Sequence, residues 1–216
     1  PVDGPKIPNG IIVIEDGRIQ ALGEDVPIPP EAIKIDARGR WITPGLIDGY
    51  THLGLVEIGG VAASNDVDSG YGFRNRASQR AVDSFNAESS LIPIQRAHGV
   101  TSVLSALRGG LISGQAGVFS LGTGRVIRER AAIVTGFGGR SGGNRGRSIS
   151  ALREILDDVR AYMTDRDRFM ATRFRPLMAS RLDLEALIPV LEKNVPLFIH
   201  ANRQSDVRAA LRFGHE

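Results

Sequence analysis

Apolar and polar residues near the start of the chain follow patterns that predict short β-strands. Residues 11–14 and 18–22 both have strand-like patterns, and they flank Asp16-Gly17, a dipeptide that suits a two-residue hairpin turn. A third stretch, 32–36, predicts another strand of the same antiparallel unit. The N-terminal part of the chain is therefore expected to form a small β-structure.

From residue 41 onward, predicted strands alternate with stretches that repeat apolar residues at helical spacing. Such alternation is typical of parallel βα units. The clearest helix covers 149–163, with apolar residues such as Leu152 on one side and charged residues such as Arg153 on the other. The expected elements are, in order, a strand from 41, a helix over 85–98, a strand over 100–107, helices over 149–163 and 182–193, a strand over 195–200 and a helix over 205–213.

The segment 41–55 combines a predicted buried strand with polar residues at its end. Its apolar residues, expected to be covered, are Trp41, Ile42, Leu46 and Ile47. Asp48, Tyr50 and His52 follow at alternating positions, and the strand period of two places these three side chains on one face. A carboxylate, a phenol and an imidazole that converge at a strand end indicate a binding or catalytic role.

The run from Ile42 to His52 resembles the first barrel strand of the amidohydrolase superfamily, nearest to its imidazolonepropionase-like and dipeptidase-like branch. In that family the strand ends in His-x-His, and both imidazoles bind a divalent metal inside a TIM-like barrel. Here Tyr50 takes the first position and only His52 remains, so the motif is degenerate. The resemblance implies that Tyr50 contributes to substrate binding and that His52 is a metal ligand.

A second stretch, 196–203, resembles the family strand that ends in a metal-binding histidine, which here is His200. In a parallel barrel the carboxyl ends of all strands face the same rim. His52 and His200 are therefore predicted to share a divalent metal, with zinc first among the ions that imidazole binds. The alternative is that each is an ordinary histidine with a backbone partner and that no metal is bound.

The resemblance implies an α/β fold with a partial TIM-like (β/α)8 barrel over 41–216, preceded by part of a small β-sandwich over 1–40. A closed barrel takes about 250 residues, and about four or five barrel strands are predicted here. The chain is thus expected to match the N-terminal half of the family's chain. The remaining histidine and the general-base aspartate are expected beyond Glu216. The missing C-terminal half, or another chain as in a homo-oligomer, is the expected partner.

A glycine-rich segment, 108–117, follows the predicted second barrel strand and contains two candidate substrate-binding residues, Arg108 and Gln115. Glycines allow the backbone to approach a ligand closely, and exposed amides beside Arg108 suit a carboxylate or phosphate. We expect a rim loop that lines the substrate pocket, with an ordinary tight turn as the alternative. Arg203, which follows His200 closely, is a further candidate for orienting a substrate carboxylate.

Composition narrows the function classes. The 216 residues are 42% hydrophobic and 24% charged, which is typical of a soluble globular protein, and no stretch approaches the about 18 apolar residues needed to span a bilayer. No membrane partner is therefore expected. The formal charge of +3 comes from arginines spread along the chain and aromatic residues are only 6%, so no nucleic-acid partner is expected. Without cysteine, disulfides, thiolate ligands and a cysteine nucleophile are excluded.

Two functional hypotheses follow for a small-molecule substrate or ligand. The resemblance implies a metal-dependent hydrolase that acts on a carbon–nitrogen bond in a non-peptide amide, a cyclic amide or a dipeptide. The alternative is a metal-free pseudoenzyme or small-molecule-binding barrel. It is favoured by Tyr50 and by the lack of any lysine between Lys34 and Lys193, because many members bridge two metals with a carboxylated lysine. Relatives with a degenerate strand are often exported, which favours the bacterial periplasm over the cytoplasm.

Overall fold

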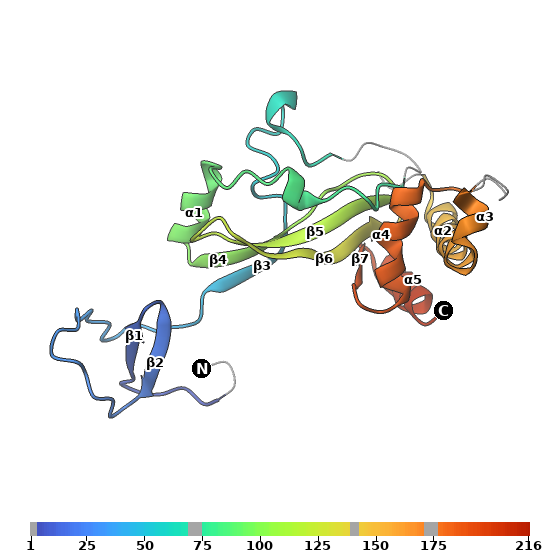
Figure 1. Ribbon diagram of the computed structural model, residues 1–216. Helices are drawn as coiled ribbons and strands as arrows, with labels where there is room; N and C mark the ends of the chain where they lie inside the picture. Colours follow the sequence, from blue (N-terminus) through green and yellow to red (C-terminus); the bar gives the residue numbers. More distant parts are fainter. Residues whose placement is uncertain (1–3, 69–74, 139–142, 171–176) are drawn as a thin grey trace. The chain divides into compact units, whose positions relative to one another are not determined.

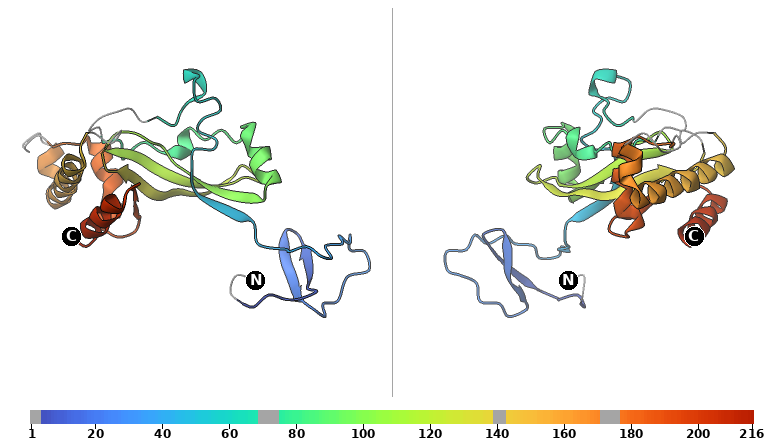
Figure 2. Two further views of the ribbon diagram at one scale, coloured as in Figure 1. Left: turned by 180° about the vertical axis from the view of Figure 1, so that it is seen from behind. Right: turned by 45° about the vertical axis from the view of Figure 1, so that its right-hand side comes forward.

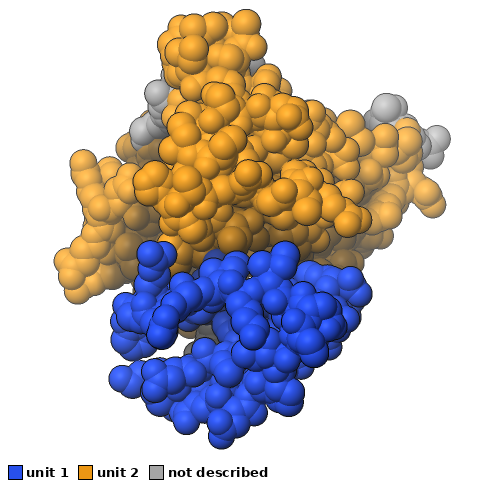
Figure 3. Space-filling view, turned by 90° about the vertical axis from the view of Figure 1, so that its left-hand side faces the viewer, with its two compact units in different colours: residues 1–45 blue, residues 46–216 orange. Residues whose placement is uncertain are grey.

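The computed structural model describes residues 4–68, 75–138, 143–170 and 177–216 (Figure 1). The chain divides into two compact units, Pro1–Gly45 and Leu46–Glu216, which are coloured separately in Figure 3. None of the helices in the described residues is both long and apolar enough to cross a membrane.

The first unit contains the predicted hairpin. Strands β1 (Ile11–Glu15) and β2 (Arg18–Gly23) pair in antiparallel fashion. Asp16 and Gly17 both adopt positive φ angles, 50° and 71°, at the turn between them. Two successive positive φ angles match the type I′ turn, whose twist suits the flanking strands. The hairpin prediction is confirmed.

Two other predictions in this part of the sequence are wrong. No strand forms over 32–36, where Ile33 is 93% and Ile35 is 87% exposed. The segment from Trp41 is not a buried strand either, since Trp41 is 79% exposed and Ile47 is 71% exposed. Residues 32–36 pair with no described strand, and the segment from Trp41 forms a strand only over Leu46–Thr51, where no described layer covers Leu46 and Ile47.

The second unit is built on a five-stranded sheet in the order β3-β4-β5-β6-β7 (Figures 1 and 2). Its strands are β3 (Leu46–Thr51), β4 (Val100–Ser105), β5 (Ile112–Ser120), β6 (Val126–Gly136) and β7 (Leu197–His200). Strands β3 and β4 are parallel, as are β6 and β7, whereas β5 is antiparallel to both of its neighbours. The expected alternation of parallel strands and helices is therefore wrong in the middle of the sheet, where β5 and β6 follow β4 directly.

Helices occupy the second half of this unit and the connections before β4. They are η1 (Ala62–Ser64), η2 (Ala81–Asp83), α1 (Leu91–Ala97), α2 (Arg145–Thr164), α3 (Arg166–Met170), α4 (Arg181–Leu191) and α5 (Gln204–Gly214). Asn144 caps α2 by accepting a hydrogen bond from Arg147 N, and Ser180 caps α4 by accepting one from Asp183 N. The helices predicted from the periodic stretches at 149–163, 182–193 and 205–213 are confirmed.

The helix predicted over 85–98 is shorter in the structure and begins only at Leu91. The preceding residues are held in a turn instead, because Asn86 N donates to the Gly54 carbonyl oxygen and Asn86 Oδ1 accepts from Glu88 N. An asparagine that binds the backbone locally competes with helix formation. Of the glycine-rich run 136–147, residues 139–142 lie outside the described residues.

The sheet separates two sets of side chains. One set packs against α2 and α4, and we call it the helix face: Ile112, Ile133, Leu197 and Ile199. Adjacent positions point the other way and form a smaller cluster, which we call the histidine face: Tyr50, Leu104, Ala106, Ala116, Val134 and Phe198. The strand period of two explains why neighbours such as Ile133 and Val134 join different clusters. Helices α2 and α4 lie together beside β6 and β7 (Figure 2).

Candidate functional site

Three residues singled out from the sequence meet at one end of the histidine face. Tyr50 lies in β3, His52 follows that strand, and His200 ends β7. The Tyr50 ring centroid is 5.5 Å from that of His52, at an interplanar angle of 71°. It is 5.7 Å from the His200 ring centroid, at 32°. The structure thus brings both histidines around one phenol, although β3 and β7 are the outermost strands of the sheet.

The His52 ring is held in place by a hydrogen bond to the backbone. Its Nδ1 lies 2.7 Å from the Ala106 carbonyl oxygen. Because a carbonyl oxygen only accepts, Nδ1 donates in this bond and Nε2 keeps its lone pair. Burial lowers the pKa of His52, with a smaller lowering from His200, while the bond to Ala106 opposes the shift. A neutral imidazole with a free Nε2 is the form that binds a metal.

Tyr50 is held by packing. Its ring stacks on Phe198, with centroids 5.0 Å apart and planes 4° from parallel. Burial raises the pKa of Tyr50, and the positive charge of Arg108 acts weakly in the opposite direction. The phenol is therefore neutral at physiological pH, and it offers a half-buried aromatic surface with a single polar group.

Arg108 lies beside this cluster and forms an ion pair with a carboxylate. Its Nε and Nη2 donate to Asp68 Oδ1 and Oδ2 at 2.9 Å and 3.2 Å. The charges of both partners act on His52, and that of Arg108 also acts on Tyr50. Asp68 is a residue that the sequence did not indicate, because nothing in its local pattern connects it to a site forty positions away. Only the fold brings it there.

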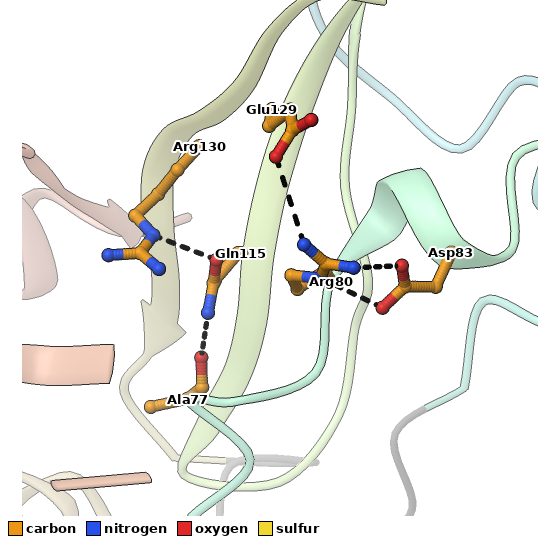
Figure 4. Close-up of polar contacts among 6 residues, drawn as sticks. All are labelled: Ala77, Arg80, Asp83, Gln115, Glu129 and Arg130. Atoms are coloured by element: carbon orange, nitrogen blue, oxygen red, sulfur yellow. Dashed lines mark hydrogen bonds and ion pairs between the residues drawn. The ribbon is translucent and has the colours of Figure 1, made fainter. Parts of the chain in front are cut away.

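Gln115 lies elsewhere. It pairs with Ile133 of β6, which belongs to the helix face, and its side chain is only 2% exposed. Gln115 Nε2 donates to the Ala77 carbonyl oxygen at 2.9 Å, and Gln115 Oε1 accepts from Arg130 Nε at 2.9 Å (Figure 4). The structure does not bring this amide together with the two histidines.

The segment 108–117 is not the rim loop that its glycines predicted. Most of it belongs to β5, which begins at Ile112 and pairs with β4 and β6. Gly114 and Gly117 serve close packing of this strand, whereas Gly109 and Gly110, with φ angles of 91° and 68°, form the bend that leads into it. Arg203, the last of the predicted substrate-binding residues, is exposed at the N-cap of α5, where its charge acts on Asp206.

Several known proteins are similar to parts of this chain. An imidazolonepropionase from Vibrio cholerae is 48% identical over 42 residues, which are 19% of this chain and 10% of that protein. A dihydroorotase from Anaeromyxobacter is 42% identical over 52 residues, which are 24% of this chain and 11% of that protein. An imidazolonepropionase from Ralstonia nicotianae is 34% identical over 114 residues, or 45% of this chain and 28% of that protein. No protein-family model matches the chain.

The similarity in structure extends much further than the similarity in sequence. The crystal structure of an amidohydrolase from Thermotoga maritima covers 94% of this chain with a TM-score of 0.79 and 23% identity. Both the matched sequence segments and the fold are similar to proteins of the amidohydrolase superfamily. The matched relatives support the imidazolonepropionase-like branch, and the predicted α/β fold with a partial TIM-like barrel is confirmed. The chain spans 56% of the Thermotoga protein.

The metal expected of an amidohydrolase fits these residues only in part. His52 and His200 are suitable ligands, and the bond from His52 Nδ1 to a backbone carbonyl is the usual outer support of a metal-binding imidazole. Tyr50 is a poor ligand because a neutral phenol must first lose its proton. Among the described residues, no three histidine, aspartate or glutamate side chains lie close enough to hold a metal together. The described part of the chain therefore provides two ligands and no complete site.

Proposed function

We propose that the full-length protein is a metal-dependent hydrolase of carbon–nitrogen bonds, acting on a non-peptide amide, a cyclic amide or a dipeptide. The observation that carries this proposal is the meeting of His52 and His200 around Tyr50 at one end of an amidohydrolase-like sheet. The matched proteins, an imidazolonepropionase, a dihydroorotase and an amidohydrolase, support the same reaction class.

Each described residue then has a role that its surroundings support. His52 and His200 hold a divalent metal, zinc first, which when bound polarises the scissile carbonyl and lowers the pKa of water to about 7. Arg108, kept in place by Asp68, presents a positive charge to an anionic group of the substrate. Tyr50 and Phe198 form an apolar wall that limits water on one side. In this proposal the remaining ligands and the general base come from outside these 216 residues, as the greater length of the Thermotoga protein allows.

A metal-free binding protein is the second candidate, and Tyr50 is the observation that favours it. The phenol stands where the family has its first histidine, and it is fixed by stacking on Phe198. A barrel that lost its metal would keep such an aromatic surface for binding a small molecule.

A hydrolysis assay separates the two candidates. The full-length protein, loaded in turn with Zn²⁺, Mn²⁺ and Fe²⁺, is incubated with non-peptide amides, cyclic amides and dipeptides, and the products are followed by mass spectrometry. We expect hydrolysis of at least one class, loss of activity in His52→Ala and in His200→Ala, and retained activity in His98→Ala. His98 is the matched control because it is exposed at the end of α1. Ligand binding without hydrolysis under all metals would favour the metal-free candidate.

We also propose that the rest of the protein, or a second copy of the chain, completes the sheet. Within the described residues β3 and β7 each pair with one neighbour only, and the β3 residues Leu46 and Ile47 are exposed. Open strand edges promote association. Residues 1–216 alone are expected to associate in size-exclusion chromatography, whereas the full-length protein is expected to elute as a defined species. A monomeric fragment that unfolds cooperatively would contradict this proposal.

A further inference from the structure

Strands β6 and β7 end side by side, and each leads into a helix. Gly136, the last residue of β6, pairs with His200, the last residue of β7. After β6 the chain continues to α2, which begins at Arg145, and after β7 it continues through 201–203 to α5, which begins at Gln204. The His200 backbone is thus placed both by β6 and by the start of α5.

One ion pair joins the first turns of these two helices. Arg145 Nε donates to Asp206 Oδ1, and Ser205 Oγ also donates to this oxygen at 3.4 Å. The Asp206 side chain is only 3% exposed, whereas that of Arg145 is 40% exposed. A buried carboxylate is costly to leave unpaired, so the guanidinium holds α2 and α5 together at this point. The hydrogen bond from Arg145 lowers the pKa of Asp206, which agrees with a carboxylate that stays charged.

Backbone bonds extend this link to both strand ends. On the β6 side, Gly138 N donates to Ser148 Oγ in the first turns of α2 at 3.1 Å. On the β7 side, Asp206 N donates to the Arg203 carbonyl oxygen at 2.9 Å. Phe213 of α5 also packs in the core of the helix face, and Arg153 of α2 pairs with Glu216 beyond α5. The Arg145–Asp206 pair, in the first turns of both helices, is the link between α2 and α5 that lies nearest to His200 in the chain.

We propose that Arg145 and Asp206 are positioning residues that hold His200 within reach of His52. They touch neither histidine. They act by fixing the distance between the exit of β6 and the exit of β7, and hence the place of the His200 imidazole next to Tyr50. This inference rests on the proposed function, because the placement of His200 matters only if His52 and His200 bind a metal together.

The test uses Co²⁺ as the probe and the full-length protein in three forms: the parent, Asp206→Asn, and the reversed pair Arg145→Asp with Asp206→Arg. The matched control is Asp157→Asn, because Asp157 also pairs with an arginine, Arg160, but on the exposed surface of α2. Loss of a group bonded directly to a metal ligand typically weakens binding about 10–100-fold, and Asp206 acts one step further out, so we expect Asp206→Asn to bind Co²⁺ about tenfold more weakly. The reversed pair should recover part of the affinity, and Asp157→Asn should match the parent.

Hydrogen exchange of the metal-free proteins provides a readout that does not depend on metal. Peptides covering 197–203 should exchange faster in Asp206→Asn than in the parent and in Asp157→Asn. Unchanged exchange and unchanged Co²⁺ affinity in Asp206→Asn would overturn the inference. If the parent binds no Co²⁺, the proposed function fails, and the exchange result alone decides whether the pair positions this segment. If Asp206→Asn does not fold, Arg145→Met takes its place, with Arg145→Lys expected to recover part of the parental behaviour.

Discussion

The helix face of the sheet packs under α2 and α4, whereas the histidine face is open around Tyr50 and Phe198, although its residues Ala106, Ala116 and Val134 are buried. On the helix face, Ile133 packs with Leu184 and Leu187 of α4, and none of the three side chains is exposed. On the histidine face, Tyr50 and Phe198 are only partly buried. Fully buried aliphatic side chains contribute stability, whereas half-exposed aromatic and imidazole groups contribute little of it. We therefore expect the helix face to contribute most to the stability of the fold and the histidine face to bind the metal and substrate.

The largest effect that would test this division is a cavity on the helix face. Replacing Leu187 by alanine should lower the free energy of unfolding by about 2–5 kcal/mol, because it removes buried methyl groups that neighbours cannot replace. Leu182→Ala, on the exposed side of the same helix, should change it by about 0.5 kcal/mol or less. Urea unfolding of the full-length protein measures both. Equal losses of unfolding free energy in the two variants would contradict the claim that the helix face stabilises the fold.

A polar residue of the helix face should also matter for stability and not for binding. Gln115→Ala removes the hydrogen bonds that the buried amide makes to the Ala77 carbonyl oxygen and to Arg130, which should cost about 1–3 kcal/mol of unfolding free energy. Metal affinity should stay at the parental value. A stable Gln115→Ala variant with impaired hydrolysis would instead support the prediction from sequence that Gln115 binds substrate.

Restoring the family motif on the histidine face should strengthen metal binding. In Tyr50→His a third imidazole joins His52 and His200, so we expect affinity for Zn²⁺ to rise at least about tenfold, or about 1.4 kcal/mol. Tyr50→Phe provides the matched control, since it keeps the ring stacked on Phe198 and adds no ligand. Competition titration with a chromogenic chelator measures the affinity. Unchanged binding in Tyr50→His would argue against a metal between these side chains.

The smallest expected effect concerns pH. Burial lowers the pKa of His52 in the folded protein below the ordinary histidine value of about 6.5. The unfolded chain therefore takes up this proton first, and the associated stability is fully present above pH 6.5 and is lost as the pH falls through the folded pKa. Between pH 7.5 and 5, the metal-free parent should lose more unfolding free energy than His52→Gln does. Parallel pH profiles in urea unfolding would contradict a buried, neutral His52.

The sequence predicted the helix face better than the middle of the sheet. Helices α2 and α4 carry a clear apolar stripe and a capping side chain, so periodicity alone located them. Strand β5 was missed because it contains two glycines and small residues, which resemble a loop. Gly114 has a φ of 133°, and a Cβ there would lie 2.7 Å from the Gln79 carbonyl oxygen. A glycine is needed at position 114 because the backbone at Gln79 passes close by, and no local sequence pattern reveals this contact.

The sequence predicted the site residues whose positions depend on strand geometry, but it did not predict those whose positions depend on how loops pack. His52 and His200 were matched because the ends of parallel strands share a rim, and the structure brings both to Tyr50. The pairing of Arg108 with Asp68 depends on how the segment after β3 folds back, and no spacing rule predicts it. Trp41 and Ile47 were expected to be buried because their residue types usually are, yet the described residues do not cover them.

The central claim, a metal shared by His52 and His200, is tested most directly by metal content. Plasma mass spectrometry of the full-length protein, purified without chelator, is compared with His52→Ala, His200→Ala and the surface control His98→Ala. We expect about one zinc, manganese or iron ion per chain in the parent and the control, as for a mononuclear site, and its loss from the other two variants. No metal in the parent, even after incubation with each ion, would contradict the claim and favour the metal-free barrel.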